Sequence, residues 1–117
     1  MQATDGATAK PWGWQIRSVF APTEEVWLAH ANAGGGMTSL HRHAKHTTQL
    51  HVLSGTIAVV LSDSKELQIL KSGETLVIPQ QKRHRLMFLS ECRFAEVYTR
   101  EKTAGVDVVD DTIRETT

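Results

Sequence analysis

The sequence of 117 residues lacks the features of a secreted or membrane-embedded protein. Cys92 is its single cysteine, so no disulfide can form within the chain and an oxidising compartment is not implied. The longest apolar run, residues 57–61, is far shorter than the roughly 18 residues of a membrane-spanning helix. Residues 1–10 contain no apolar segment typical of a signal peptide. We therefore expect a cytoplasmic protein in which Cys92 is a buried and unreactive thiol.

An excess of charge of one sign is also missing. Thirteen Lys and Arg residues balance thirteen Asp and Glu residues, which gives a formal net charge of +0. A balanced charge does not favour binding to nucleic acid or to an anionic membrane. Because 40% of the residues are hydrophobic and 22% are charged, the composition is that of one globular domain with its own core. We expect a small-molecule partner, and neither nucleic acid nor a membrane.

Long stretches with helical periodicity are absent between residues 12 and 70. Short runs of apolar and β-branched residues occur instead, separated by Gly, Pro and Ser residues typical of turns. These runs are residues 26–30, 50–53, 56–61, 67–70, 75–78, 85–89 and 93–98. Short strands at intervals of about 8 to 12 residues are typical of a β-sandwich or a β-barrel. We predict an all-β fold with Leu86, Phe88, Phe94 and Val97 in its core.

Histidines, in contrast, are concentrated in one part of the chain. Four of the six fall within eleven residues, at positions 41, 43, 46 and 51. Because side chains alternate along a strand, His41 and His43 would project to the same side, where two imidazoles can share a metal ion. His84, five positions after Pro79, is the candidate third ligand from another strand. The alternative is that these are ordinary solvated histidines of a sheet surface.

The glycines and prolines around these histidines resemble the two motifs of the cupin family, Gly-x5-His-x-His-x(3,4)-Glu-x6-Gly and Gly-x5-Pro-x-Gly-x2-His-x3-Asn. The matching positions are Gly35, His41, His43 and Gly55 for the first motif and Gly73, Pro79 and His84 for the second. Thr48, Gln81 and Phe88 stand where the motifs have Glu, Gly and Asn. The resemblance implies a double-stranded β-helix, or jelly-roll, barrel whose mouth holds a metal on three histidines.

The composition of the two ends, together with the resemblance, indicates the organisation of the chain. Residues 11–102 would form a single cupin barrel domain, after a flexible N-terminal segment at residues 1–10. Residues 103–117, which are charged, would be a C-terminal extension or a short helix. Small cupins are commonly dimers, and outward apolar side chains of residues 57–61 would gain from pairing, so we expect a homodimer.

A narrower similarity is to the mannose-6-phosphate isomerase type of cupin. It is carried by Pro11-Trp12-Gly13, Ser39-Leu40-His41-Arg42-His43, Ser54-Gly55-Thr56, Leu70-Lys71-Ser72-Gly73-Glu74, His84-Arg85-Leu86 and Asp110-Asp111-Thr112-Ile113-Arg114. This similarity implies metal-dependent exchange between an aldose and a ketose. That family has Glu-His-Trp where this chain has Thr48-Gln49-Leu50.

The glutamate that often completes a cupin site is therefore replaced by Thr48. Thr48 itself, Gln49 and His51 are candidate fourth ligands, the last two if the strand register slips by one. His46, in the turn, is a further possibility, and the alternative for His46 and His51 is an ordinary histidine of the surface. Arg42 and Lys82 are candidate contacts for an anionic substrate. Zn, Fe, Mn and Ni all accept imidazole ligands, so the sequence leaves the divalent metal open. No residue is assigned as catalytic, since nothing in the sequence directs Glu74 or Glu96 toward the metal.

Three functions follow from these features. The first is a metal-dependent enzyme that acts on a small polar molecule such as a sugar phosphate or an organic acid, in the manner of an isomerase. The second is an Fe(II)-dependent dioxygenase, which strict iron dependence and oxygen uptake would distinguish from the first. The third is a non-catalytic cupin that senses or stores a ligand, or serves a structural role, and that shows no turnover.

Overall fold

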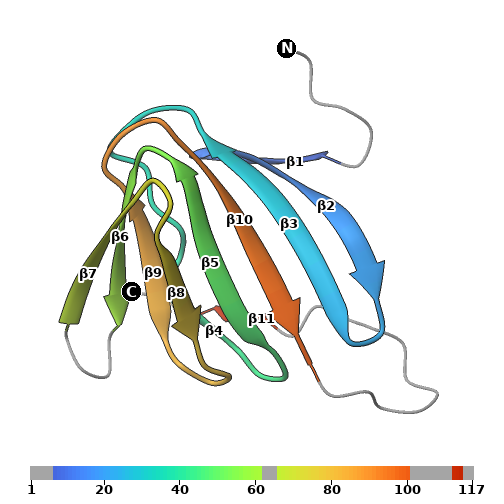
Figure 1. Cartoon of the computed structure of the whole chain (residues 1–117). Coiled ribbons are helices and arrows are strands. Elements are labelled where there is room, and N and C mark those ends of the chain that lie inside the picture. The colour runs from blue at the N-terminus through green and yellow to red at the C-terminus, as the bar shows by residue number, and fades with distance from the viewer. Residues whose placement is uncertain (1–6, 62–65, 101–111, 115–117) are drawn as a thin grey trace.

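The computed structural model describes residues 7–61, 66–100 and 112–114, and within these ranges the chain forms strands and no helix (Figure 1). The strands are β1 (Ala7–Lys10), β2 (Gly13–Ala21), β3 (Glu24–Ala31), β4 (His41–His43), β5 (Thr47–Ser54), β6 (Thr56–Leu61), β7 (Glu66–Lys71), β8 (Thr75–Ile78), β9 (His84–Phe88), β10 (Cys92–Thr99) and β11 (Thr112–Arg114). The predicted all-β fold is thus confirmed. A membrane-crossing helix of sufficient length and hydrophobicity is not found in the described part of the chain.

Two antiparallel sheets face each other. The six-stranded sheet has the order β1-β2-β3-β10-β5-β8, and the five-stranded sheet has the order β11-β4-β9-β6-β7. Many neighbours in space are therefore distant in sequence, as expected for a jelly roll. The pairing of β4 with β9 sets His41 directly opposite His84. The fold itself thus joins the two histidine-bearing segments that the sequence separates.

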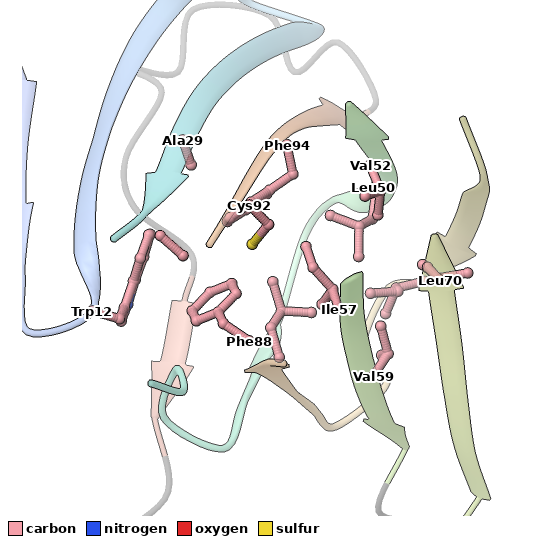
Figure 2. Packing of buried hydrophobic residues seen from close by; sticks show 13 residues of the cluster. Trp12, Ala29, Leu50, Val52, Ile57, Val59, Leu70, Phe88, Cys92 and Phe94 are labelled. Atoms are coloured by element: carbon pink, nitrogen blue, oxygen red, sulfur yellow. The ribbon is translucent and has the colours of Figure 1, made fainter. Parts of the chain in front are cut away.

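The core lies between the two sheets and follows the alternation of the strands. On β9, His84, Leu86 and Phe88 are buried and the residues between them are only half-buried. Phe88 packs against Trp12 and Phe94, with ring centroids 4.9 and 5.5 Å apart (Figure 2). Removing these large side chains from water supplies roughly 1.5–3 kcal/mol each. Cys92 is fully buried in the same cluster, as the sequence predicted.

The interior changes from apolar to polar along the strands. On β9 the inward residues run from Phe88 through Leu86 to His84. On β10 the buried positions run from Phe94 to Glu96 in the same manner. β5 repeats the change, with buried residues Val52, Leu50 and Thr48. One end of the barrel interior is therefore a hydrophobic core, while the other end gathers polar side chains.

The three cupin-motif glycines, Gly35, Gly55 and Gly73, all have a positive φ that suits glycine. Gly55, between β5 and β6, has φ +82°, and a Cβ there would lie 2.3 Å from the carbonyl oxygen of Glu91. Gly73, between β7 and β8, has φ +88° but open space around it. Gln81 keeps a positive φ of 68° at the position where the second motif has glycine. The turn geometry of the motif is therefore kept although its glycine is not.

The chain ends differ in part from the sequence expectation. Within the segment 1–10, expected to be flexible, Ala7–Lys10 forms β1, because its backbone pairs with β2 from Ala7↔Ile16 to Lys10↔Gly13. Within the C-terminal extension, Thr112–Arg114 forms β11, which pairs with β4. This strand is neither a helix nor separate from the sheet. Residues 1–6, 101–111 and 115–117 lie outside the described part of the chain.

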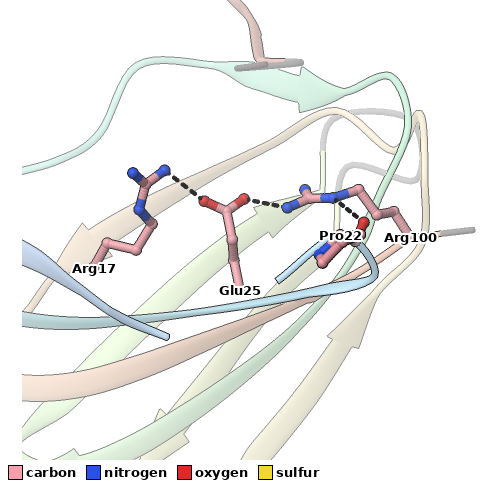
Figure 3. Close-up of polar contacts among 4 residues, drawn as sticks. All are labelled: Arg17, Pro22, Glu25 and Arg100. Atoms are coloured by element: carbon pink, nitrogen blue, oxygen red, sulfur yellow. Dashed lines mark hydrogen bonds and ion pairs between the residues drawn. The ribbon is translucent and has the colours of Figure 1, made fainter. Parts of the chain in front are cut away.

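A buried ion-pair cluster joins the β2–β3 hairpin to the end of β10. The guanidinium groups of Arg17 and Arg100 donate to opposite oxygens of Glu25, at 3.2 and 2.8 Å (Figure 3). Arg100 Nε also donates to the carbonyl of Pro22 at 3.2 Å. Glu25 and Arg100 are both about nine-tenths buried, so each needs the other to remain charged inside the protein.

Candidate metal centre

Three of the predicted ligands come together at the polar end of the barrel. His41 and His43 lie on β4, and His84 begins β9 opposite His41. Their ring centroids are 4.3 Å (His41–His84), 5.0 Å (His41–His43) and 5.4 Å (His43–His84) apart. One ligand nitrogen from each ring lies within 4.8 Å of the other two. Three imidazole nitrogens at this spacing can surround one divalent ion.

Hydrogen bonds to the backbone orient two of these rings. Nδ1–H of His41 donates to the carbonyl of Ser39 at 2.7 Å, and Nδ1–H of His84 donates to the carbonyl of Lys82 at 2.9 Å. Because each Nδ1 carries the proton, Nε2 keeps its lone pair for another partner. Nε2 of His84 is buried and makes no hydrogen bond to any described residue. Such an arrangement is typical of a histidine that binds a metal through Nε2.

The electrostatics of His84 also suit a metal ligand. Burial, followed by the nearby charge of His41, lowers the pKa of His84 from 6.5 to about 4, although the hydrogen bond to Lys82 opposes the shift. His84 is therefore neutral at physiological pH. The neutral imidazole is the form that coordinates metals.

A stack of rings that the sequence did not predict backs the cluster. His46, in the turn between β4 and β5, is buried and lies 4.0 Å from the His43 ring and 3.9 Å from the Tyr98 ring, centroid to centroid. Tyr98, on β10, also lies 5.3 Å from His43. His46 falls outside the group whose ligand atoms lie within 4.8 Å. It therefore packs against a candidate ligand and is not itself one of the three.

The candidate fourth ligands fall on opposite faces of β5. Thr48 is fully buried, and its Oγ1 has no hydrogen-bond partner among the described residues. Gln49 and His51 lie on the outer face, where their side chains are 3.3 Å apart and His51 also contacts Thr75 at 3.0 Å. The register irregularity between β5 and β10 lies at Arg93/Phe94, away from Gln49. The slip that would turn Gln49 and His51 inward is therefore not seen here.

The candidate anion contacts lie beside the histidines in sequence. Arg42 lies between His41 and His43 on β4, so strand alternation directs it to the opposite face. Lys82 lies in the turn before β9 and holds His84 through its backbone carbonyl. A role in substrate binding stays a prediction for both side chains.

The turns that carry the histidines are bonded to each other. The backbone N–H of Gln81 donates to the carbonyl of His43 at 2.8 Å. The side-chain amides of Gln80 and Gln81 both donate to the carbonyl of Ala44, at 2.8 and 3.0 Å. These bonds fix the β8–β9 turn against the end of β4. They therefore fix the positions of His43 and His84 relative to each other.

Two glutamates are buried in the barrel, and their surroundings differ. Glu25 is held by two guanidinium groups. Glu96, on β10, is 8% exposed, and no hydrogen bond or ion pair joins its side chain to a described residue. Burial alone raises the pKa of Glu96 from 4.5 to about 7. Glu96 shares the inner face of β10 with the buried residues Cys92 and Phe94, a placement that the sequence analysis did not predict.

Comparison with known proteins identifies the family. The sequence profile described as "Cupin domain" matches residues 27–98, more than half of the chain. The chain therefore belongs to the cupin family. This family membership and the two facing sheets confirm the predicted cupin barrel. The match to the cupin family does not support the narrower similarity to the mannose-6-phosphate isomerase type. No match was found among curated proteins.

Solved structures support the same fold. KdgF from Halomonas sp. is similar with a TM-score of 0.71 and 18% identity, over 80% of this chain and 85% of that one. A Klebsiella pneumoniae protein with a double-stranded β-helix domain gives 0.70 and 15%, over 100% and 90% of the two chains. Salicylate 1,2-dioxygenase from Pseudoaminobacter salicylatoxidans, solved with gentisate, gives 0.70 and 23%, over 80% of this chain and 26% of that one. Identities this low establish the fold alone.

Proposed function

We propose that this cupin binds a divalent transition metal through His41, His43 and His84, and that it acts on a small anionic molecule at that site. The observation that carries the proposal is the convergence of three imidazole nitrogens within 4.8 Å, at the polar end of the barrel interior. The buried Nε2 of His84, without a hydrogen-bond partner among the described residues, fits a metal as its missing partner.

The chemistry of the donor set limits what such a site can do. Three neutral imidazoles bring no negative charge, so a bound divalent ion would keep its +2 charge and act as a Lewis acid on a carbonyl or carboxylate oxygen. The replacement of the motif glutamate by Thr48 leaves this charge uncompensated. An anionic ligand, such as an organic acid or a sugar phosphate, would supply the compensating charge. Salicylate 1,2-dioxygenase, part of which has a similar fold, was solved with gentisate.

Metal content tests the proposal directly. Untagged protein is dialysed against Zn²⁺, Fe²⁺, Mn²⁺ or Ni²⁺ and analysed by mass spectrometry, beside His84→Ala. His30→Ala is the matched control, because His30 lies on β3 and pairs with Glu91 at 3.0 Å, outside the cluster. We expect about one ion per chain in the wild type and in His30→Ala. Loss of the ion only in His84→Ala supports the site, and absence of metal from the wild type would exclude it.

Activity and ligand-binding assays of the metal-loaded protein then distinguish the remaining functions. Iron dependence with oxygen uptake would favour a dioxygenase, and turnover without oxygen would favour an isomerase of the mannose-6-phosphate isomerase type. Tight binding of a ligand without turnover would favour a sensing role. The homodimer expected from the sequence also stays a prediction. Size-exclusion chromatography with light scattering, which gives the mass of the protein in solution, tests it.

A further inference from the structure

Beside the histidine cluster, the barrel interior contains buried polar groups that have no hydrogen-bond partner among the described residues. The indole Nε1 of Trp27 and the hydroxyl of Thr48 are buried and bond to no described group. The Glu96 side chain, also buried, has no ion pair or hydrogen bond to the described chain. Buried polar groups are nearly always hydrogen bonded. Several unmet groups in one region therefore point to a bound polar molecule.

The strand register shows that these groups share one region. Glu96 on β10 lies directly opposite Trp27 on β3. Thr48 on β5 lies opposite Tyr98, the next residue on the same face of β10 as Glu96. Neighbouring strands are about 4.8 Å apart, and successive same-face residues are about 7 Å apart. Trp27, Glu96 and Thr48 thus form a continuous part of the inner face.

Tyr98 connects this part of the inner face to the candidate metal centre. Its ring centroid lies 5.3 Å from that of His43, and Glu96 is the adjacent inward position on β10. A small molecule held at the histidines would therefore extend toward the carboxyl group of Glu96. Leu50 on β5 lies directly opposite Glu96, and Phe94 is the next inward residue of β10 away from Tyr98; both are fully buried in the apolar core. The carboxyl group thus stands at the boundary between core and site.

Comparison with Glu25 separates a functional role from a structural one. Glu25 joins β3 to β10 through its ion pair with Arg100, so its burial serves the fold. Glu96 joins nothing in the described chain. A buried carboxyl group without a partner opposes folding, and such groups are concentrated at functional sites.

We propose that Glu96 is the catalytic base that removes a proton from the carbon next to the carbonyl group of a small organic ligand bound at the histidine cluster. This inference rests on the proposed function and assigns its reaction class. The carboxylate takes the proton, the C–H electron pair forms a carbon–carbon double bond, and the carbonyl π electrons move to oxygen. Return of a proton, or of a deuteron in D₂O, to the same carbon restores the carbonyl group and regenerates the carboxylate, so no oxidant or reductant is consumed. Thr48 and Trp27 would donate hydrogen bonds to the ligand's oxygen atoms.

The acid strength of the group suits this role. Because burial raises its pKa to about 7, Glu96 is divided between its acid and base forms at neutral pH. A general base is most effective when its pKa lies near the working pH.

Exchange of deuterium from the solvent into the carbon next to a carbonyl group tests the proposal. The full chain loaded with Zn²⁺ is incubated in D₂O with pyruvate, hydroxypyruvate or fructose 6-phosphate, and loss of the proton signal next to the carbonyl is followed by NMR. We expect Glu96→Gln to slow the exchange by about 100-fold or more, the lower range for general-base catalysis, while zinc content is unchanged. Glu74→Gln, which makes the same chemical change at an exposed residue, should exchange like the wild type.

A second readout does not depend on turnover. Binding of oxalate, an unreactive dianion, is measured by calorimetry at pH 7 in buffers of different ionisation enthalpy. A negative ligand beside Glu96 favours the protonated form of that carboxyl group, so the wild type should take up a fraction of a proton that Glu96→Gln does not.

The outcomes distinguish the two proposals. Failure of the wild type to bind any of Zn²⁺, Fe²⁺, Mn²⁺ and Ni²⁺ overturns the proposed function. Zinc binding without exchange of any of the three probes overturns the role of Glu96 as a carbon base, and leaves the metal site in place. Exchange or proton uptake that is equal in the wild type and Glu96→Gln also overturns it.

Discussion

The burial of Glu96 makes a quantitative prediction about stability. The pKa of this carboxyl group is about 7 in the folded protein and 4.5 when unperturbed. Because the folded pKa is the higher one, the folded state holds the proton more tightly. The resulting stabilisation is complete below pH 4.5 and is lost as the pH rises through about 7. At about 1.4 kcal/mol per pH unit, the difference amounts to about 3 kcal/mol.

Glu96→Gln removes this dependence, because glutamine resembles the protonated carboxyl group in shape and stays neutral. We expect the free energy of unfolding of the variant, relative to the wild type, to rise by about 2 to 3 kcal/mol between pH 5 and pH 8, because the unfolded carboxyl group is already partly ionised at pH 5. Urea denaturation of metal-free protein at four pH values in this range measures the difference. Other titrating groups, His84 among them, are present in both proteins and cancel.

Glu74→Gln again serves as the control, because Glu74 is exposed and the substitution removes the same charge. Its comparison with the wild type isolates the effect of losing a charge from the surface. A relative stability of Glu96→Gln that stays within about 0.5 kcal/mol of constant, the size of an ordinary surface effect, would refute the reasoning. It would mean that Glu96 is solvated or paired in solution.

Three further predictions concern the metal, the turns and the thiol. Zn²⁺ at one hundred times its Kd should stabilise the wild type by about 2.7 kcal/mol in thermal denaturation at pH 7.5. The stabilisation should be smaller at pH 5, because protons compete with the metal for the imidazoles, and it should be absent in His84→Ala. Gly55→Ala should lower the free energy of unfolding by about 3 kcal/mol or more, because its Cβ would overlap the backbone of Glu91. Gly73→Ala should lower it by only about 1 kcal/mol, because Gly73 has a positive φ but open space around it. Equal losses of stability in the two variants would contradict the steric argument. Burial raises the pKa of Cys92 from 9.0 to about 11, so a thiol reagent should modify the native protein about 100-fold more slowly than the denatured one, and rapid modification would show that the core opens.

Much of the fold could be predicted from local features of the sequence. Short apolar runs between turn residues indicated strands, and the period of two placed His41 and His43 on one face of a strand. The pairing of His84 with His41 could not follow from periodicity, since 43 positions separate the two residues. Only the membership of His84 in the same site was predicted, from its position after Pro79 and from the spacing of the cupin motifs, which carries long-range information that a local pattern lacks.

The inner face of β10 shows why the remainder of the site could not be predicted. Phe94 and Val97 both suit a core, but they lie on opposite faces of the strand, and the structure fully buries Phe94 while Val97 is only half-buried. Favouring Val97 would have placed Glu96 outside. Only the register of β10 with β3 and β5 decides between the faces, and register depends on partners more than 40 positions away. The stacking of His46 on Tyr98 was not predicted for the same reason, because it joins a turn to a distant strand.

The polar end of the barrel is best understood as a region where stability and function oppose each other. An interior built only for folding would continue the apolar series of Phe88 and Leu86, since well-packed hydrophobic residues are often at least as stabilising as buried polar ones. The chain instead ends that series with His84, and it buries Thr48 and Glu96 without partners among the described residues. Each such group lowers the free energy of unfolding. Glu25, buried nearby on β3 but fully paired, shows that this fold can satisfy a buried carboxylate where structure alone requires it. The unmet groups are therefore best explained by a ligand that completes their bonding.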